Sequence, residues 1–300
     1  MTAVYTPVPG AGNDDAPLPK ALRAPIARGE LRDEAQLREH YLIERELADR
    51  LRRAAPDERR RLYAQVYDEL YRRVPHHPMN RPSGHPRAAG VERDLVFLRR
   101  FLRPTTAFLE IGAGDCALAC RVAAVVRRVV AVDVSEEIMR LAPSAMNLER
   151  ALSDGTSIPV RAGSIDVAFS DQLMEHLHPD DAAEQLRNIH RALAPGGVYL
   201  CITPNRLYGP RDISGYFDDV ATGFHLREYT GGELAPLFRS VGFSRLRFYA
   251  GARGWYLPVP AAPVHAAETA LEMLPAPARR RVAGVAPVRA LLGLRVAAIK

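Results

Sequence analysis

The sequence contains little cysteine and no long apolar segment. Its three cysteines, Cys116, Cys120 and Cys201, include no CxxC pair, so they predict no disulfide framework. No run of about 18 apolar residues occurs, so we expect no transmembrane helix. The first 20 residues lack the basic and apolar regions of a signal peptide, so a cytoplasmic location is expected. We see no metal site in the sequence, because the histidines near residue 80 lie in a proline-rich stretch typical of a loop.

Lysine is nearly absent too. Only Lys20 and Lys300 occur, so arginine supplies almost all of the positive charge. The chain has 41 basic and 35 acidic residues, which gives a formal net charge of +6. The arginines are spread along the chain and interleaved with Glu and Asp, a pattern typical of a solvated surface. We therefore expect no nucleic-acid partner, although the basic balance by itself would favour one.

The first 90 residues differ from the rest of the chain in their composition and hydrophobic pattern. Residues 1–28 are rich in proline and predict a disordered or loosely draped arm. Helical periodicity follows over residues 31–53 and restarts after Pro56, with Asp57 as the expected N-cap. Prolines and glycines over residues 74–90 predict a loop. Residues 1–90 are thus expected to form an arm and a helical extension that can act as a lid.

Three tyrosines in the second of these helices share one face. Tyr63, Tyr67 and Tyr71 lie four residues apart, which places them in a row on a helix. Such a row is either core or docking surface, or an aromatic wall that faces a substrate.

From residue 91 to residue 300 the pattern indicates a single α/β domain. Helical and apolar strand segments alternate, which predicts a Rossmann-like, mostly parallel sheet with helices on both faces. The strands are expected over residues 107–111, 129–134, 150–152, 166–170, 198–203, 243–250 and 294–299. Helical patches within residues 251–290 predict an insertion before the last strand, which can pair antiparallel with the strand before it.

The first strand of this domain leads into a glycine loop. Glu110-x-Gly112-x-Gly114 lets a ligand approach the backbone, because glycine has no Cβ and accepts unusual φ and ψ. The helix that follows presents free N–H groups to such a ligand. The second strand ends at Asp133, where an acid can bind both ribose hydroxyls of an adenosine. Together these features indicate an adenosine-containing cofactor and leave NAD and S-adenosylmethionine open.

Polar residues after the third and fourth strands help to distinguish NAD from S-adenosylmethionine as the cofactor. Asp154 follows the third strand and can accept a hydrogen bond from an adenine amino group. Asp171 and Gln172 follow the fourth strand, at the edge where such sheets bind ligands. Glu175-His176-Leu177 comes directly after them, and Ala194-Pro195-Gly196-Gly197 marks a firm stop after the next helix.

This ordered set of motifs resembles class I S-adenosylmethionine-dependent methyltransferases over about residues 91–250. The run His225-Leu226-Arg227-Glu228-Tyr229-Thr230 is similar to the branch that acts on small molecules such as quinone precursors, sugars and lipids. The resemblance implies a seven-stranded sheet with one antiparallel strand and S-adenosyl-L-methionine as the cofactor. It also implies these cofactor-binding residues: Glu110, Gly112 and Gly114 at the methionine moiety, Asp133 with Val134 at the ribose, Asp154 with Gly155 at the adenine, and Asp171 and Gln172 at the front of the site.

We therefore expect methyl transfer to a small-molecule acceptor, with a hydroxyl as the receiving group. His176 is the first candidate for a general base, followed by His225 and Glu228, although the Glu-His pair can simply order a helical turn. Loop residues Tyr208, Arg211, Tyr216 and Phe217 are candidates for acceptor contacts. The alternatives are an RNA methyltransferase, a nicotinamide-dependent dehydrogenase and a cofactor-binding scaffold without turnover.

Overall fold

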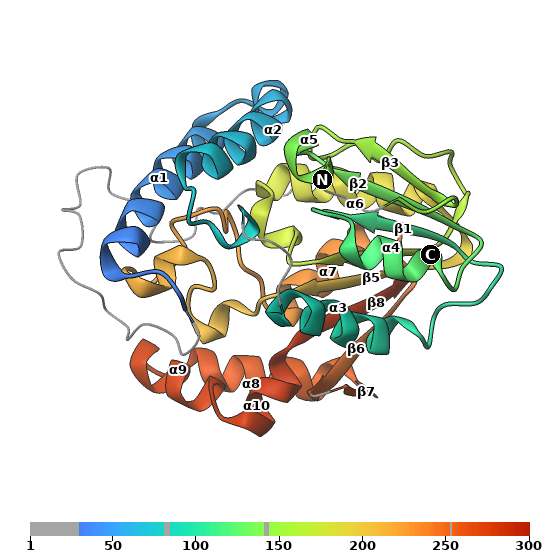
Figure 1. The fold of residues 1–300 in the computed structure, drawn as a ribbon. Helices are drawn as coiled ribbons and strands as arrows, with labels where there is room; N and C mark the ends of the chain where they lie inside the picture. The colour runs from blue at the N-terminus through green and yellow to red at the C-terminus, as the bar shows by residue number, and fades with distance from the viewer. Residues whose placement is uncertain (1–29, 81–84, 141–143, 253) are drawn as a thin grey trace.

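The computed structural model describes residues 30–80, 85–140, 144–252 and 254–300. The predicted arm over residues 1–28 lies outside the described residues. The described chain forms a central sheet, a pair of N-terminal helices at its carboxyl edge and a group of C-terminal helices (Figure 1). No helix of the described residues is both long and apolar enough to cross a bilayer.

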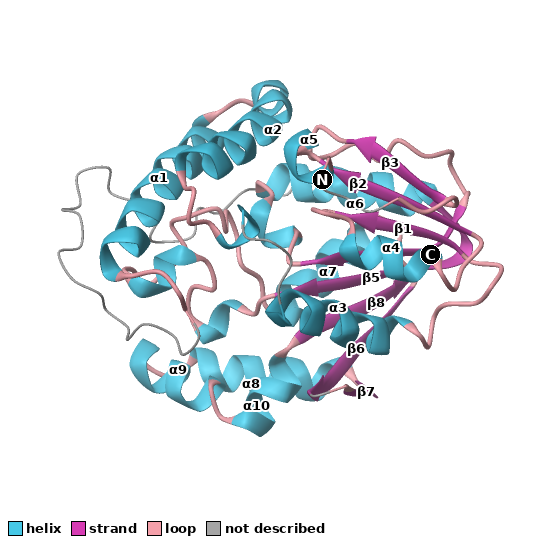
Figure 2. Ribbon diagram, in the orientation of Figure 1, coloured by secondary structure: helices cyan, strands magenta, loops and turns pink. Residues whose placement is uncertain are grey.

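One eight-stranded sheet runs through the domain, with helices on either side (Figure 2). Its strands follow the order β3-β2-β1-β4-β5-β8-β6-β7. They are β1 (Ala107–Ile111), β2 (Arg128–Asp133), β3 (Leu148–Leu152), β4 (Ile165–Asp171), β5 (Leu193–Thr203), β6 (Arg245–Ala252), β7 (Trp255–Val259) and β8 (Leu294–Ile299). The first five strands pair in parallel. Strand β8 is antiparallel to β5 and β6, and β7 is antiparallel to β6.

The mostly parallel sheet confirms the predicted fold class, and it has one strand more than the seven that the resemblance implies. The extra strand is β7, which pairs with β6 at the sheet edge, inside the segment predicted as a helical insertion. Trp255 begins this strand with 81% of its surface exposed. Five residues that include Pro258 give no clear strand signal, because proline is confined to sheet edges. The rest of the insertion is helical, in α8 (Ala261–Glu272), α9 (Ala276–Ala283) and α10 (Ala286–Leu292).

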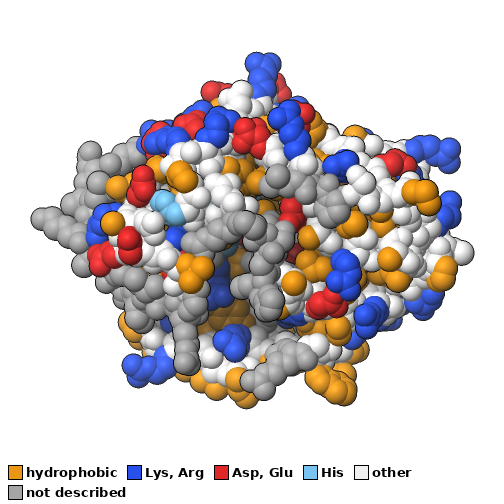
Figure 3. Space-filling view, viewed as in Figure 1, with side chains coloured by type: hydrophobic (Ala, Val, Ile, Leu, Met, Phe, Trp, Pro, Cys, Tyr) orange, Lys and Arg blue, Asp and Glu red, His pale blue; other side chains and the backbone are white. Residues whose placement is uncertain are grey.

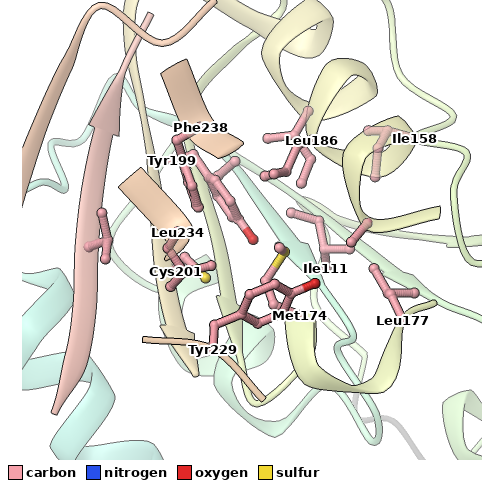
Figure 4. Packing of buried hydrophobic residues seen from close by; sticks show 14 of the residues in the cluster. Ile111, Ile158, Met174, Leu177, Leu186, Tyr199, Cys201, Tyr229, Leu234 and Phe238 are labelled. Atoms are coloured by element: carbon pink, nitrogen blue, oxygen red, sulfur yellow. The ribbon is translucent and has the colours of Figure 1, made fainter. Parts of the chain in front are cut away.

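Both faces of the sheet are apolar, as a parallel sheet covered by helices requires. Alternate residues of each strand point to opposite faces. Leu109 of β1 therefore packs with α6 (Pro179–Ala192) and α7 (Gly231–Ser240), whereas Phe108 packs with α3 (His85–Leu98) and α4 (Ala117–Ala123). On the first face, Tyr199 stacks on Phe238 with ring centroids 5.7 Å apart (Figure 4).

Two boundaries differ from the prediction for a reason that involves proline. Helix α2 (Pro56–Arg73) has Ala55 at its N-cap, so Asp57 lies in the first turn and is not the cap. Helix α3 begins at His85, inside the segment predicted as a loop. In both cases a proline occupies the first turn of a helix, where its missing N–H has no partner to lose.

Strand β5 also begins earlier than predicted. It reaches back to Leu193, through the segment interpreted as a turn, and its pairing with β4 is irregular there.

Helix α1 (Glu34–Arg53) and α2 pack against each other at the carboxyl edge of the sheet. Asp33 caps α1 and forms a capping box with Gln36. Basic and acidic side chains lie close together over these helices (Figure 3), where Arg73 pairs with both Glu46 and Glu69. The interleaved charge of the sequence is thus present at this surface as ion pairs.

Candidate cofactor and acceptor site

A cavity of about 540 Å³ lies at the carboxyl ends of β1, β2 and β4. One part of its wall comes from the loops after these strands, which is where doubly wound sheets bind ligands. The other part comes from α1, α2 and the segments around residues 78, 212 and 225. Eight of the predicted site residues line the cavity: Gly112, Gly114, Asp133, Val134, Gly155, Gln172, His176 and His225.

The glycine loop after β1 adopts the left-handed backbone that its sequence predicts. Gly112 has φ +72° and Gly114 has φ +53°, which L side chains rarely adopt. A Cβ on Gly112 would lie 3.1 Å from Cδ1 of Leu173 and would reduce the space above the loop. The Gly112 N–H donates to the carbonyl of Val132 at 2.8 Å, so the loop is held against β2.

Asp133 joins this loop to the end of β2. Its Oδ2 accepts from the Gly114 N–H at 2.7 Å, and its Oδ1 accepts from the Ser135 N–H at 2.9 Å. Burial raises the pKa of Asp133, and these backbone hydrogen bonds oppose the rise. The carboxylate is thereby fixed at the cavity wall beside Val134.

The two residues predicted at the adenine occupy different positions. Gly155 lines the cavity with φ +94°. The Asp154 side chain instead closes its own turn, because Oδ1 accepts from the backbone N–H groups of Thr156 and Ser157 at 3.0 and 2.7 Å. Burial opposes ionisation of Asp154, but these hydrogen bonds outweigh it and lower the pKa. Asp154 is not among the residues that line the cavity, so its contact with adenine stays a prediction.

Glu110 also lies outside the cavity wall. Only 6% of its surface is exposed, and burial raises its pKa well above the usual range. Its Oε2 has no hydrogen-bond partner among the described residues. A buried oxygen in this state is available to a ligand that enters the glycine loop.

Asp171 and Gln172 end β4 in contrasting environments. Burial raises the pKa of Asp171, which is hydrogen-bonded to Asp94 of α3 and lies 4.0 Å from the Arg93 guanidinium. Gln172 lines the cavity with φ +54°, a left-handed conformation that is unusual for a residue other than glycine. Its N–H donates to the carbonyl of Ile202 at 2.8 Å, which holds the turn in place.

All three tyrosines of α2 line the cavity, so the row forms an aromatic wall. The Tyr63 hydroxyl donates to Asp181 at 2.8 Å, and its ring packs over Gly155. Tyr67 lies between Phe224 and His176, with ring centroids 4.7 and 6.1 Å away. The N-terminal helices therefore complete the site.

The two candidate bases, His176 and His225, are in contact with each other in the wall of the cavity. The rings of His176 and His225 are perpendicular, with centroids 4.8 Å apart. His225 Nδ1 lies 2.6 Å from Oε1 of Glu228, and its Nε2 lies 3.9 Å from Oε1 of Glu175. The other oxygen of Glu175 accepts from the Thr203 hydroxyl at 2.8 Å.

Burial and charge give these groups different protonation states. Burial lowers the pKa of His176 well below its usual value, so this imidazole is neutral at neutral pH. Burial also acts to lower the pKa of His225, but the hydrogen bond to Glu228 and the charges of Asp212 and Glu175 raise it to about 9. Burial raises the pKa of Glu175 to about 7. His225 is therefore a cation near neutral pH, and His176 is the group with a free lone pair.

Several residues of the cavity wall were not predicted from the sequence. His40 and Glu44 of α1 are hydrogen-bonded at 2.8 Å, and Glu44 also accepts from the Phe224 N–H. Their spacing of four residues is the only sequence signal, and it is common on helix surfaces. Of the predicted loop contacts, Arg211 and Tyr216 line the cavity, whereas Tyr208 and Phe217 are not among its lining residues.

A doubly wound sheet with a glycine loop after β1 and an acid at the end of β2 defines an α/β domain for an adenosine-containing cofactor. Residues 109–201 match the family model described as a methyltransferase domain. Over this segment the chain is thus similar to methyltransferase domains, in agreement with the resemblance to class I S-adenosylmethionine-dependent methyltransferases that the sequence motifs carry.

Known proteins show where the similarity lies. A probable S-adenosylmethionine-dependent methyltransferase from Mycolicibacterium smegmatis is 32% identical over 136 residues, which are 45% of this chain and 51% of that protein. An uncharacterized 37.1 kDa protein in a transposon of Streptomyces fradiae is 30% identical over 155 residues, 47% of this chain and 44% of that protein. The chain thus spans about half the length of the curated relatives it matches. A solved S-adenosylmethionine-dependent methyltransferase from Mesorhizobium loti is 16% identical, covers 70% of this chain and 100% of its own, and has a TM-score of 0.46.

Proposed function

We propose that this protein transfers a methyl group from S-adenosylmethionine to a hydroxyl oxygen of a small molecule. The observation that carries the proposal is a single cavity whose wall joins the glycine loop and Asp133 to the tyrosine row and His176. A cofactor at the loop and an acceptor beside the tyrosines would therefore share one cavity.

The residues at the loop end of the cavity fit the cofactor. The left-handed glycines have no side chain to cover the backbone, and Glu110, which directly precedes the last residue of β1, has a buried Oε2 without a hydrogen-bond partner among the described residues. Asp133 is held at the end of β2, the position from which an acid reaches ribose hydroxyls. We assign Gly112, Gly114, Asp133, Val134, Gly155 and Gln172 to cofactor binding, with Glu110 and Asp171 as supporting groups.

The opposite end of the cavity fits a small acceptor. Side chains from α1, α2 and three further segments surround it, which suits a molecule that enters whole. The aromatic rings of Tyr67, Tyr71 and Phe224 supply apolar contact area, and Arg211 and Asp212 supply polar contacts.

The chemistry needs alignment and a route for one proton. When bound, S-adenosylmethionine supplies an electrophilic methyl carbon, whose bond to sulfur breaks as its bond to the acceptor oxygen forms, leaving a neutral thioether. The cavity wall would confine the acceptor oxygen beside that carbon, and such positioning accounts for much of the acceleration of two-reactant steps. His176 takes the hydroxyl proton, because its ring is neutral and its Nδ1 has no hydrogen-bond partner among the described residues. His225 is protonated near neutral pH, so it positions groups by charge and is not the base.

Labelled-methyl transfer from S-adenosylmethionine to small-molecule extracts tests the activity directly. We expect Asp133→Ala to weaken cofactor binding measured by calorimetry. His176→Gln should lower turnover about a hundredfold and leave cofactor affinity unchanged. The matched control is His190→Gln, because His190 lies in α6 against Phe243, away from the cavity. Methylated product with full turnover in His176→Gln would remove His176 from the mechanism, and absence of transfer to any extract would contradict the proposed activity.

A further inference from the structure

Glu175, His176 and His225 bring three potential metal ligands together at one point. Each offers a carboxylate oxygen or a ring nitrogen, and these atoms all lie within 4.8 Å of one another. Glu175 and His176 lie in the turn after β4, and His225 lies in the segment before α7. The two histidines are 49 residues apart in the sequence. We propose that this cluster binds a divalent transition-metal ion of the Zn²⁺ or Ni²⁺ type.

Glu175 has a free oxygen where no solvent reaches it. None of its side chain is exposed, and its Oε2 accepts from Thr203. Its Oε1 has no hydrogen-bond partner among the described residues. An unsatisfied buried polar atom is costly and therefore rare in folded proteins. A cation beside Oε1 would remove that cost.

His225 is oriented as metal-binding histidines are. Its Nδ1 is hydrogen-bonded to Glu228, whose Oε1 also accepts from the Arg211 N–H at 2.8 Å. A carboxylate at one ring nitrogen fixes the tautomer and directs the other nitrogen at the ion. That other nitrogen, Nε2, faces Oε1 of Glu175 at 3.9 Å. An ion bound there would displace the proton that His225 carries without metal, and this proton would pass to solvent.

His176 completes the set of ligands. Its Nδ1 is buried and has no hydrogen-bond partner in the described part of the chain. Two ligand atoms that are each about 2.1 Å from one tetrahedral ion lie about 3.4 Å apart. The 3.9 Å between Nε2 of His225 and Oε1 of Glu175 therefore closes with a small side-chain movement.

The ligand types select the class of ion. Imidazole suits zinc, iron, copper and nickel, whereas magnesium and calcium prefer all-oxygen sites. Three protein ligands leave a coordination position open, as in catalytic zinc sites. Because His176 and His225 line the cavity, we place this open position on the acceptor side.

The ion would change how the acceptor is activated, and this consequence rests on the proposed function. A divalent ion lowers the pKa of an oxygen placed against it. The hydroxyl proton would then pass to water, since the lone pair of His176 would be used for the metal. Metal ligand and general base are thus alternative roles for His176, and metal binding decides between them.

Calorimetric titration of the chelator-treated full chain with ZnCl₂ and with NiCl₂, without cofactor, tests the site. We expect one ion per chain in the wild type. Binding should weaken at least tenfold in Glu175→Gln, which keeps the shape of the side chain and an oxygen for Thr203. It should weaken similarly in His176→Gln, and His190→Gln should bind as the wild type does.

Two further measurements cover the case in which a variant does not fold. Bound Co²⁺ should give visible absorption bands in the wild type at one equivalent, and the metal should raise the unfolding temperature. Equal affinity in wild type and a folded Glu175→Gln, or no binding of either ion, overturns the proposal. Methyl transfer by a chain that binds no ion would overturn the metal site alone, whereas metal binding without any methyl transfer would overturn only the proposed activity.

Discussion

Arg59 and Asp181 form a buried bidentate ion pair between residues 122 positions apart in the chain. Nε and Nη2 of Arg59 lie 2.7 and 2.9 Å from the two carboxylate oxygens, and both side chains are 3% exposed. The pair joins α2 to α6, and the Tyr63 hydroxyl donates to the same carboxylate. It therefore sets where the tyrosine row lies against the cavity.

Breaking this ion pair should strongly destabilise the folded protein. We expect Asp181→Asn to lower the free energy of unfolding by about 3 to 5 kcal/mol, because it removes the buried carboxylate that neutralises Arg59 and leaves the more distant and mostly exposed Asp180, at 3.8 Å. Urea denaturation measures the change. Replacing both residues, in Arg59→Met with Asp181→Leu, should recover a large part of the loss.

A matched ion pair on the same two helices provides the control. Arg60 and Glu184 lie 2.9 Å apart but are each about one third exposed. Arg60→Met should therefore lower the free energy of unfolding much less than Asp181→Asn does. If Asp181→Asn and Arg60→Met lowered the free energy of unfolding by similar amounts, burial would not make the Arg59–Asp181 pair more important for stability than an exposed pair.

The contact between Gly155 and Tyr63 leads to a second prediction. A Cβ on Gly155 would lie 2.4 Å from Cδ2 of Tyr63, so Gly155→Ala must push Tyr63 and α2 away from the turn after β3. We expect a loss of about 1 to 3 kcal/mol from this overpacking, in addition to backbone strain, and weaker cofactor binding. Gly163→Ala isolates the strain, because Gly163 has φ +69° with nothing within 4 Å of its Cβ position. Equal unfolding free energies for Gly155→Ala and Gly163→Ala would show that the contact with Tyr63 adds no destabilisation beyond backbone strain.

These contacts show what the sequence could and could not predict. The bounds of β1 and β8 were predicted correctly, since short buried apolar runs end there at proline, glycine or the chain end. The left-handed glycines and the position of Asp133 at the end of β2 were predicted, because both depend on neighbours within one βαβ unit. The strand β7 was missed, because it is a short exposed edge strand that contains proline.

Relationships between distant segments gave no local signal. The sequence left two interpretations of the tyrosine row open, and only the packing of α2 over Gly155 shows that it faces the cavity. The sequence likewise indicated no metal site, because Glu175 and His225 lie in segments with different local patterns. Their meeting depends on how the loop before α7 folds back over the end of β4.

Asp94 and Asp171 predict a pH dependence of stability. Burial and the neighbouring Asp171 raise the pKa of Asp94 to about 7, against 3.8 for an unperturbed aspartate. The folded state therefore favours the protonated carboxyl, and the stability present at pH 4 is lost as the pH rises towards 7. For one proton the loss is up to about 1.4 kcal/mol per pH unit.

Unfolding free energies at several pH values between 4 and 8 measure this loss. Asp94→Asn cannot ionise, so its stability should fall less steeply with pH than that of the wild type. The control is Glu92→Gln on the exposed side of the same helix, which should keep the wild-type slope. If the unfolding free energies of wild type and Asp94→Asn changed with pH in parallel, Asp94 would not be the group that causes the pH dependence.

Gln172 provides the fourth prediction, through its left-handed backbone. Gln172→Gly accepts φ +54° without strain, so stability should be unchanged or higher by up to about 1 kcal/mol. The variant also removes a side chain from the cavity wall, so the Kd for S-adenosylmethionine should rise up to about tenfold. Thermal unfolding and calorimetry give the two values. If Gln172→Gly were less stable but bound S-adenosylmethionine with unchanged affinity, the Gln172 side chain would stabilise the fold and would not contact the cofactor.

The exposed edge strand β7 has a practical consequence. Trp255 is the single tryptophan of the chain, and it lies on the β6–β7 hairpin with 81% of its surface in contact with solvent. Its fluorescence therefore reports on that hairpin and is insensitive to ligands in a cavity that it does not line. A tryptophan introduced at Tyr71, in a background with Trp255→Phe, would move the optical probe to the cavity wall.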